Sequence, residues 1–190
     1  MYVWIGFDVD SQLKELKRKS LEAEAQAQFR VQGSTLPLHI SLKMPFEAAD
    51  ASCPRILDAL EGFFMGLSPF TVPVAGLENE HAIAWLRMGE SGELDRIHHA
   101  LDDLLQREFG IVRHEYDTHY KFHVTLFLDP DPQKNDLAFS LIRDASHPGR
   151  LNVRRVCFGV SPHGGPGTYR MVRSLPLEDR AGGADRNTSL

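Results

Sequence analysis

Two short segments of the chain each place a histidine two residues before a hydroxyl side chain. The first reads HISL at residues 39–42, and the second reads HVTL at residues 123–126. An imidazole exchanges protons near neutral pH, and a hydroxyl donates a hydrogen bond to an anionic oxygen. If the two segments meet in the fold, two imidazoles and two hydroxyls are suited to cleaving a phosphate ester by acid–base catalysis without a metal ion.

Both segments lie in runs in which apolar and polar residues alternate, which is typical of a β-strand with one face in the core. The polar face of each run combines a histidine, a hydroxyl residue and a lysine: His39, Ser41 and Lys43 in the first, and His123, Thr125 and Lys121 in the second. His119 falls on the same face, just before the second strand. We expect Lys43, Lys121 and His119 to contact a phosphate or a leaving oxygen.

A polar face of this composition is also common on strands that simply face solvent. One match to so short a pattern carries little weight. The chain has nine histidines, and only these two stand in the order histidine, apolar, hydroxyl, apolar. Because both fall on equivalent strands, the repetition favours a functional site.

The motif strands need a scaffold, and the chain alternates strand and helix patterns along most of its length. The periodicity predicts strands at 2–9, 37–46, 70–75, 81–88, 121–128, 151–160 and 168–175, and helices at 11–32, 52–66, 91–109 and 133–143. Ser91 is the expected N-cap of the third helix, which Gly110 ends. The order strand, long helix, motif strand, short helix, strand occurs before Gly76 and again after it. This order predicts an internal duplication in which each half contributes one motif strand to a shared groove.

Composition limits the partners and the compartment. The chain has 190 residues, 42% of them hydrophobic, and a net charge of −5 without a long basic run. These values disfavour binding along an extended nucleic-acid duplex and leave a nucleotide or an RNA end as a partner. Cys53 and Cys157 form no Cys-x-x-Cys unit, and neither a signal peptide nor a membrane-spanning run is evident. We therefore expect a cytoplasmic protein that does not bind a membrane, with a folded part at 1–176 and a mobile tail at 177–190.

The two tetrapeptides, together with their separation and the chain length, resemble the paired motifs of the two-histidine (2H) phosphoesterase superfamily. That superfamily includes bacterial 2′-5′ RNA ligases, now regarded largely as RNA 2′,3′-cyclic phosphodiesterases, and the plant and fungal cyclic nucleotide phosphodiesterases. The resemblance extends over 1–176 in element order, but only the tetrapeptides are specific. It implies an α+β fold of two lobes, each an antiparallel sheet with outer helices. It also implies an active site in the central cleft that uses neither a metal nor another cofactor.

The resemblance also implies roles for individual residues. His39 and His123 are the expected catalytic groups, and Ser41 and Thr125 are expected to bind the phosphate oxygens. Opening a 2′,3′-cyclic phosphate needs a base that deprotonates water and an acid that protonates the leaving ribose oxygen. The sequence leaves open which histidine is which, and our working assignment makes His123 the base and His39 the acid. With both pKa values near the ordinary value of about 6.5, activity is expected to be bell-shaped around neutral pH.

The loop at 161–167 has the Gly and Pro content of a hairpin turn, and it lacks the Gly-Lys-Ser/Thr ending of a phosphate-binding loop. We expect it to border the cleft, where Tyr169 or Arg170 could stack on a base or contact phosphate.

Two other function classes fit parts of the sequence. A metal hydrolase could use His39 and His123 as ligands, but no carboxylate stands at ligand spacing beside either motif and no His-Glu-x-x-His occurs. The stronger alternative is a non-catalytic module that binds a nucleotide or an RNA end in the same cleft. Because the two lobes pair within one chain, we expect a monomer. The sequence does not identify the exact substrate.

Overall fold

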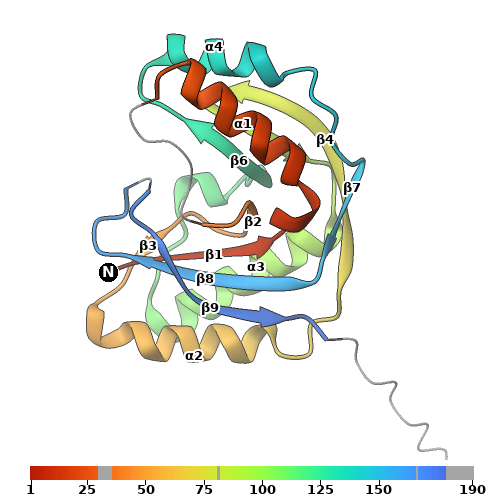
Figure 1. Ribbon diagram of the computed structural model, residues 1–190. Coiled ribbons are helices and arrows are strands. Elements are labelled where there is room, and N and C mark those ends of the chain that lie inside the picture. The colour runs from red at the N-terminus through yellow and green to blue at the C-terminus, as the bar shows by residue number, and fades with distance from the viewer. Residues whose placement is uncertain (30–35, 81, 166, 179–190) are drawn as a thin grey trace, which may run out of the picture.

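The computed structural model describes residues 1–29, 36–80, 82–165 and 167–178 (Figure 1). The last residues of the helix expected at 11–32, and residues 179–190 of the expected tail, lie outside these ranges. Residue 81 of the expected strand at 81–88 and residue 166 of the 161–167 loop also lie outside them.

The described residues form strands, α-helices and three short 3-10 helices in an order close to the expected one. The strands are β1 (Tyr2–Asp8), β2 (His39–Ser41), β3 (Phe46–Glu47), β4 (Phe70–Glu80), β5 (Ile83–Met88), β6 (His123–Leu128), β7 (Arg150–Val153), β8 (Arg155–Ser161) and β9 (Arg170–Pro176). The helices are α1 (Lys14–Gln26), α2 (Cys53–Phe64), α3 (Gly92–Phe109) and α4 (Pro132–Ile142), with the 3-10 turns η1 (Asp10–Gln12), η2 (Asp50–Ser52) and η3 (Glu115–Asp117).

Three strand predictions and one helix prediction need correction. The strand expected at 70–75 extends to Glu80 as β4, and the helix expected at 11–32 ends at Gln26. The strand expected at 37–46 is only three residues long, and the chain after it returns to the sheet as the short β3. The strand expected at 151–160 is two strands, because β7 pairs with β4 whereas β8 pairs with β1 and β9. One alternating run of residues therefore serves two distant parts of the sheet.

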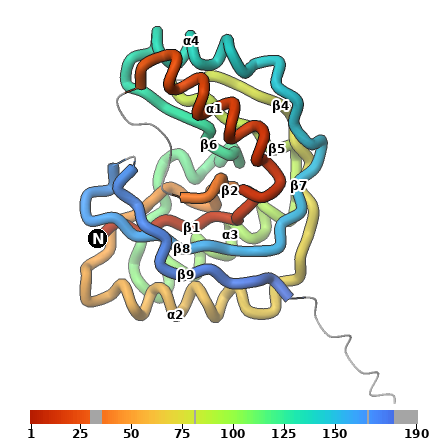
Figure 2. The backbone as a smooth tube through the Cα atoms, in the orientation of Figure 1, coloured from red at the N-terminus to blue at the C-terminus, as the bar shows by residue number. Residues whose placement is uncertain are grey.

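The strands form one antiparallel path in the order β7-β4-β5-β6-β2-β1-β8-β9, with β3 beside β1. The α+β class with antiparallel strands is thus confirmed, and the two expected sheets are joined where β2 pairs with β6. Figure 2 shows β1 between β2 and β8, so segments far apart in sequence lie side by side. The internal duplication stays a prediction.

The helices pack in pairs on the two halves of this sheet. Helix α1 contacts α4 and β6, and α2 contacts α3 (Figure 1). Helix α3 begins at Ser91, whose hydroxyl accepts a hydrogen bond from the Leu94 amide, and ends at Gly110 with a left-handed φ of 68°. Both ends match the sequence expectation, because a short hydroxyl residue suits an N-cap and glycine adopts positive φ without strain.

Within the described ranges, no helix combines the length and the apolar character that a membrane crossing would require. Within the same ranges, no three His, Cys, Asp or Glu side chains are grouped as ligands of a metal ion would be.

The junction between the two halves is a single register pair in which Ile40 of β2 lies opposite Val124 of β6. Both side chains are fully buried and belong to the main hydrophobic core. These are the residues that follow the two motif histidines. The core therefore holds the two motif strands together from the side opposite to the histidines.

We expect Ile40→Ala to lower the free energy of unfolding by about 2–5 kcal/mol, because it removes buried methyl groups and leaves a cavity at the junction. Leu128→Ala on β6 is the control, because Leu128 is exposed. Urea unfolding followed by circular dichroism and by tryptophan fluorescence measures both variants. Equal stabilities of the two variants would show that the junction contributes little.

Candidate active site

The register of β2 and β6 brings the two motifs together. Because the strands are antiparallel and Ile40 lies opposite Val124, His39 lies toward Thr125 and Ser41 toward His123. All four of these side chains are partly exposed, whereas Ile40 and Val124 are buried on the other side. We call this side of the junction, with His39, Ser41, His123 and Thr125, the two-histidine face. The expectation that both imidazoles lie on one face of the sheet agrees with this register.

The two histidines are held in the same way. Nδ1 of His39 lies 2.7 Å from the carbonyl oxygen of Pro37, and Nδ1 of His123 lies 2.6 Å from that of Lys121. A carbonyl oxygen only accepts, so each Nδ1 carries the proton and donates it. In the neutral ring, Nε2 then has a free lone pair with which to exchange a proton with a substrate or water.

Each histidine also packs against a tryptophan, and these are the two tryptophans of the chain. The rings of Trp4 and His39 are 4.1 Å apart between centroids with an interplanar angle of 67°, and those of Trp85 and His123 are 4.7 Å apart at 34°. Trp4 comes from β1 beside β2, and Trp85 from β5 beside β6. Neither contact was predicted from the sequence, because the residue pattern does not establish which strands neighbour the motif strands.

Trp4 fits beside His39 only because glycines lie beneath it. A Cβ atom on Gly6 would lie 2.6 Å from Cζ2 of Trp4 and 2.9 Å from Cδ2 of His39. A Cβ atom on Gly159 of β8 would lie 2.8 Å from Cε3 of Trp4. These glycines leave the space in which both rings lie over the sheet.

Burial lowers the pKa of both histidines. The pKa of His39 falls to about 4, mainly through burial; the Pro37 carbonyl opposes the shift and a charge on nearby His123 adds to it. Burial also lowers the pKa of His123, and the hydrogen bond to the Lys121 carbonyl opposes that shift. Neutral imidazoles are thus favoured at both positions.

Trp85, Arg87 and Glu78 add a second set of polar contacts next to His123. Arg87 of β5 lies opposite His123 of β6, and its Nε donates to Glu78 of β4 at 2.6 Å. Glu78 also accepts a 3.3 Å hydrogen bond from Nε1 of Trp85. Arg87 is 43% exposed, so it provides a positive charge that a ligand can reach. The sequence shows that Arg87 and Trp85 lie on the same face of one strand, but it does not show that Arg87 lies opposite His123.

Tyr120 links the two motifs. The Ser41 side chain lies close enough to influence the pKa of its phenol, and its ring stacks on that of His123, with centroids 6.4 Å apart and planes at 29°. Burial raises the pKa of the phenol, so the hydroxyl keeps its proton. No sequence signal pointed to Tyr120, because it precedes β6 in an irregular segment.

The structure places the expected contact residues in different environments. The prediction for Lys43 is wrong, because β2 ends at Ser41 and the alternation ends with it. Lys43 is instead 2% exposed and lies 2.6 Å from both Asp102 and Asp117. Lys121 is exposed and pairs with Glu80 at 3.0 Å, and His119 is exposed in the turn before β6.

Tyr169 and Arg170, the two residues expected to contact a ligand near the 161–167 loop, also lie in different environments. Tyr169 packs against the cluster that contains Trp4 and Cys157, and its hydroxyl donates to the Gly164 carbonyl at 3.3 Å. Arg170 begins β9 and is exposed. Of the two, Tyr169 is therefore placed beside the tryptophan that packs on His39.

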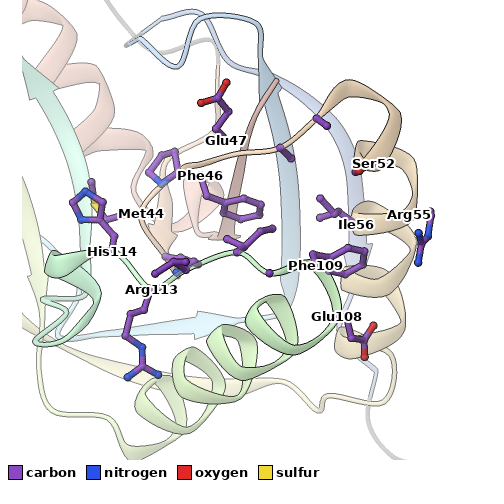
Figure 3. Close-up of a pocket in the computed structure, with 17 residues that line it drawn as sticks. Met44, Phe46, Glu47, Ser52, Arg55, Ile56, Glu108, Phe109, Arg113 and His114 are labelled. Carbon is purple, nitrogen blue, oxygen red and sulfur yellow. The ribbon is translucent and has the colours of Figure 1, made fainter.

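A pocket of about 760 Å³ is lined by none of the four residues of the two-histidine face (Figure 3). It is bounded by the segment after the first motif, by α2 and by the connection that follows α3, with Phe46, Ile56 and Phe109 facing it (Figure 3). Neither motif histidine lines this pocket. Its position does not suit the chemistry that the motif residues offer.

Comparisons with known proteins identify a family and a fold. Residues 8–165 match the family model of the 2′-5′ RNA ligase superfamily. Among solved structures, the protein TT0787 of Thermus thermophilus is similar, with a TM-score of 0.60 and 17% identity over 95% of this chain and 100% of that one. A protein described as a phosphoesterase gives a TM-score of 0.58 and 14% identity over 92% and 97% of the two chains.

E. coli LigT complexed with 3′-AMP gives a TM-score of 0.53 and 14% identity, over 92% of this chain and 96% of that one. At these identities the structural likeness shows the fold. The comparison with curated protein sequences finds no match.

We expect Gly6→Ala to displace Trp4 and His39, because the added methyl group would overlap both rings. The ring resonances of His39 in ¹H–¹⁵N NMR spectra should shift, and the protein should be destabilised by about 1–3 kcal/mol as overpacked cores are. Gly62→Ala in α2 is the matched control, because a Cβ atom there meets nothing within 4 Å. An unchanged His39 spectrum in Gly6→Ala would contradict the close packing described above.

Proposed function

The chain belongs to the 2′-5′ RNA ligase superfamily of 2H phosphoesterases, and we propose that it opens a cyclic phosphate on a nucleotide or an RNA end without a metal ion. The observation that carries the proposal is the β2–β6 register, which sets two Nδ1-anchored histidines and two hydroxyl residues on one face. E. coli LigT has been crystallised with 3′-AMP, with NADP⁺ and with ATP. A nucleotide ligand for this chain is consistent with those complexes.

In the proposed reaction, one histidine removes a proton from water as the water oxygen bonds to phosphorus. The other histidine protonates the ribose oxygen as its bond to phosphorus breaks, which leaves a phosphate monoester. Both proton transfers use Nε2, because Nδ1 of each ring is hydrogen-bonded to a backbone carbonyl. After product release, the two histidines return to their starting protonation states by exchange with solvent.

The pKa shifts favour an assignment opposite to the working one. The base must be neutral, and the pKa of about 4 keeps His39 neutral over most of the accessible pH range. Because a charge on His123 is one of the causes that lower the pKa of His39, a single proton on the pair is proposed to reside on His123, which would act as the acid. We therefore propose His39 as the base and His123 as the acid in hydrolysis.

Hydroxyl groups and a cation would stabilise the negative charge that develops on the phosphate. Ser41 and Thr125 lie beside the histidines and can donate to the non-bridging oxygens. Arg87 is proposed to contribute a charge-assisted contact, with Glu78 holding its Nε and leaving its terminal nitrogens to the ligand.

The alternative function is a module that binds a nucleotide or an RNA end without turning it over. Low histidine pKa values are compatible with binding alone, so an activity assay is needed to distinguish the enzyme from the binding module. Tight binding of a 2′,3′-cyclic nucleotide with no product would favour this alternative.

We expect His39→Ala and His123→Ala each to lower kcat/KM for 2′,3′-cyclic nucleotides by roughly 10²–10⁴-fold, because each removes one proton-transfer group. Ser41→Ala and Thr125→Ala should each cost about 1.5–3 kcal/mol of transition-state binding, as expected for a lost hydrogen bond to a charged group. Product formation followed by chromatography, with and without EDTA, measures these changes.

The control for these variants is His99→Ala, because His99 is exposed on α3. It should retain full activity. A folded His123→Ala variant with full activity, or loss of wild-type activity on chelation, would contradict the proposed mechanism.

The pH dependence of kcat/KM should be bell-shaped, with its maximum on the acid side of the ordinary histidine pKa of about 6.5 rather than at neutrality. Activity should fall as the pH drops through about 4, because His39 becomes protonated and can no longer act as the base. It should also fall as the pH rises through the lowered pKa of His123, because the acid loses its proton. Initial rates at low substrate concentration give this profile, and a maximum well above that ordinary value would exclude the assignment.

A further inference from the structure

A buried cluster of charged residues lies directly behind the first motif. It comprises Lys43, His98, Asp102, Arg113 and Asp117, which we call the buried ion cluster. The proposed reaction uses none of these groups. His98 and Asp102 come from α3, Asp117 from η3, and Lys43 from the residues that follow β2. Burying so many charges is costly unless each is paired, so their placement calls for a physical reason.

His98 occupies an unusual position in this cluster because both of its ring nitrogens face carbonyl oxygens. Nδ1 lies 2.7 Å from the oxygen of Leu42, and Nε2 lies 2.9 Å from the oxygen of Asp117. A neutral imidazole has one donor and one acceptor, whereas a carbonyl oxygen accepts only. Both hydrogen bonds form together only when both nitrogens carry protons. The geometry therefore requires an imidazolium, in a side chain that is 2% exposed.

The groups that face His98 can support this charge. Within α3, Oδ2 of Asp102 lies 3.7 Å from Nε2 and favours the charge, whereas the ring of His99, 5.5 Å away between centroids, is exposed. Asp102 also accepts from Lys43 at 2.6 Å and from Arg113 at 2.7 Å.

The remaining neighbours of His98 come from η3 and from the segment after it. The Asp117 carboxylate accepts from Lys43 at 2.6 Å and from the Met44 amide at 3.0 Å. The neutral ring of Tyr120 lies against the imidazole. Three cations and two carboxylates thus share the cluster, with Arg113 partly exposed to solvent.

Two contacts lead from His98 to the two-histidine face. Leu42, whose carbonyl accepts from His98, is the last residue of the HISL segment and follows Ser41 directly. Tyr120 stacks on His98 with centroids 5.0 Å apart and planes at 18°. The same Tyr120 stacks on the ring of His123, with centroids 6.4 Å apart. His98 thus contacts the backbone of one motif and the tyrosine that joins both.

We propose that His98 is a positioning residue that remains a buried imidazolium and thereby fixes Ser41 and Tyr120 for phosphate binding. Loss of its charge would leave one ring nitrogen with a lone pair facing a carbonyl oxygen. The end of β2 or the stack with Tyr120 would then have to move. The effects on phosphate binding and on catalysis rest on the proposed function, whereas the charge state of His98 does not.

The first measurement is the protonation state of His98 in the full chain. ¹H–¹⁵N NMR spectra of ring nitrogens identify an imidazolium by two protonated nitrogens, and comparison with His98→Gln assigns the signals. We expect both ring nitrogens of His98 to carry a proton in these spectra, because both face carbonyl acceptors. A single protonated nitrogen at neutral pH would overturn the proposal.

The second measurement is phosphate binding by His98→Gln, with His99→Gln as the matched control on the same helix. Inorganic phosphate is titrated while the ring signals of His39 and His123 are followed. We expect His98→Gln to weaken phosphate roughly tenfold and to raise KM for a 2′,3′-cyclic nucleotide by a similar factor, with a smaller change in kcat. His99→Gln should match the wild type, because His99 is exposed.

Tyr120→Phe keeps the ring stack and removes the hydroxyl beside Ser41, so it tests the second contact even if His98→Gln does not fold. It should also weaken phosphate while His98 keeps both protons. The proposal would be overturned if His98→Gln and Tyr120→Phe, or whichever of them folds, bound phosphate as tightly as the wild type. A wild-type protein that binds phosphate but cleaves no substrate, with weaker binding in the variants, would refute the proposed function and support this inference.

Discussion

The antiparallel pairing of Ile40 with Val124 is the constraint on which the site depends. It joins the two halves of the sheet, and it does so at the residues that follow the two histidines. Because side chains alternate along a strand, burying this pair turns His39, Ser41, His123 and Thr125 to the opposite face. A shift of one residue in either strand would turn the polar groups of that strand into the core. The register that completes the core therefore also assembles the candidate active site.

The surroundings of the histidines determine their chemistry. Each imidazole has one nitrogen bonded to a backbone carbonyl and one face against a tryptophan. The apolar surroundings disfavour the charged ring, so the pKa values fall below the ordinary value. Gly6 and Gly159 permit this packing because they leave room for Trp4. Glycine and tryptophan residues, which exchange no protons themselves, thus help to lower the pKa values of the proposed catalytic histidines.

The buried ion cluster shows how the end of β2 is held. Strand β2 is only three residues long, so its own hydrogen bonds fix little of the chain that follows. Beyond Ser41, the Leu42 carbonyl, the Lys43 ammonium and the Met44 amide are each bonded to groups of α3 or η3. The helix that packs behind the first motif therefore replaces the support that a longer strand would give.

The sequence by itself determined the motif pairs and the ends of α3, whereas the α+β class came from the family resemblance that the motif pairs carry. These features depend on local signals: alternation along a strand, a hydroxyl N-cap at Ser91 and a glycine at position 110. The tertiary structure alone decided the contacts across strands. Lys43 has the parity of a site residue but is buried, because β2 ends before it. Trp4, Arg87 and Tyr120 lie beside the motifs because β1, β5 and the segment before β6 do. Those neighbours follow from the pairing of distant segments, which residue patterns along one strand do not encode.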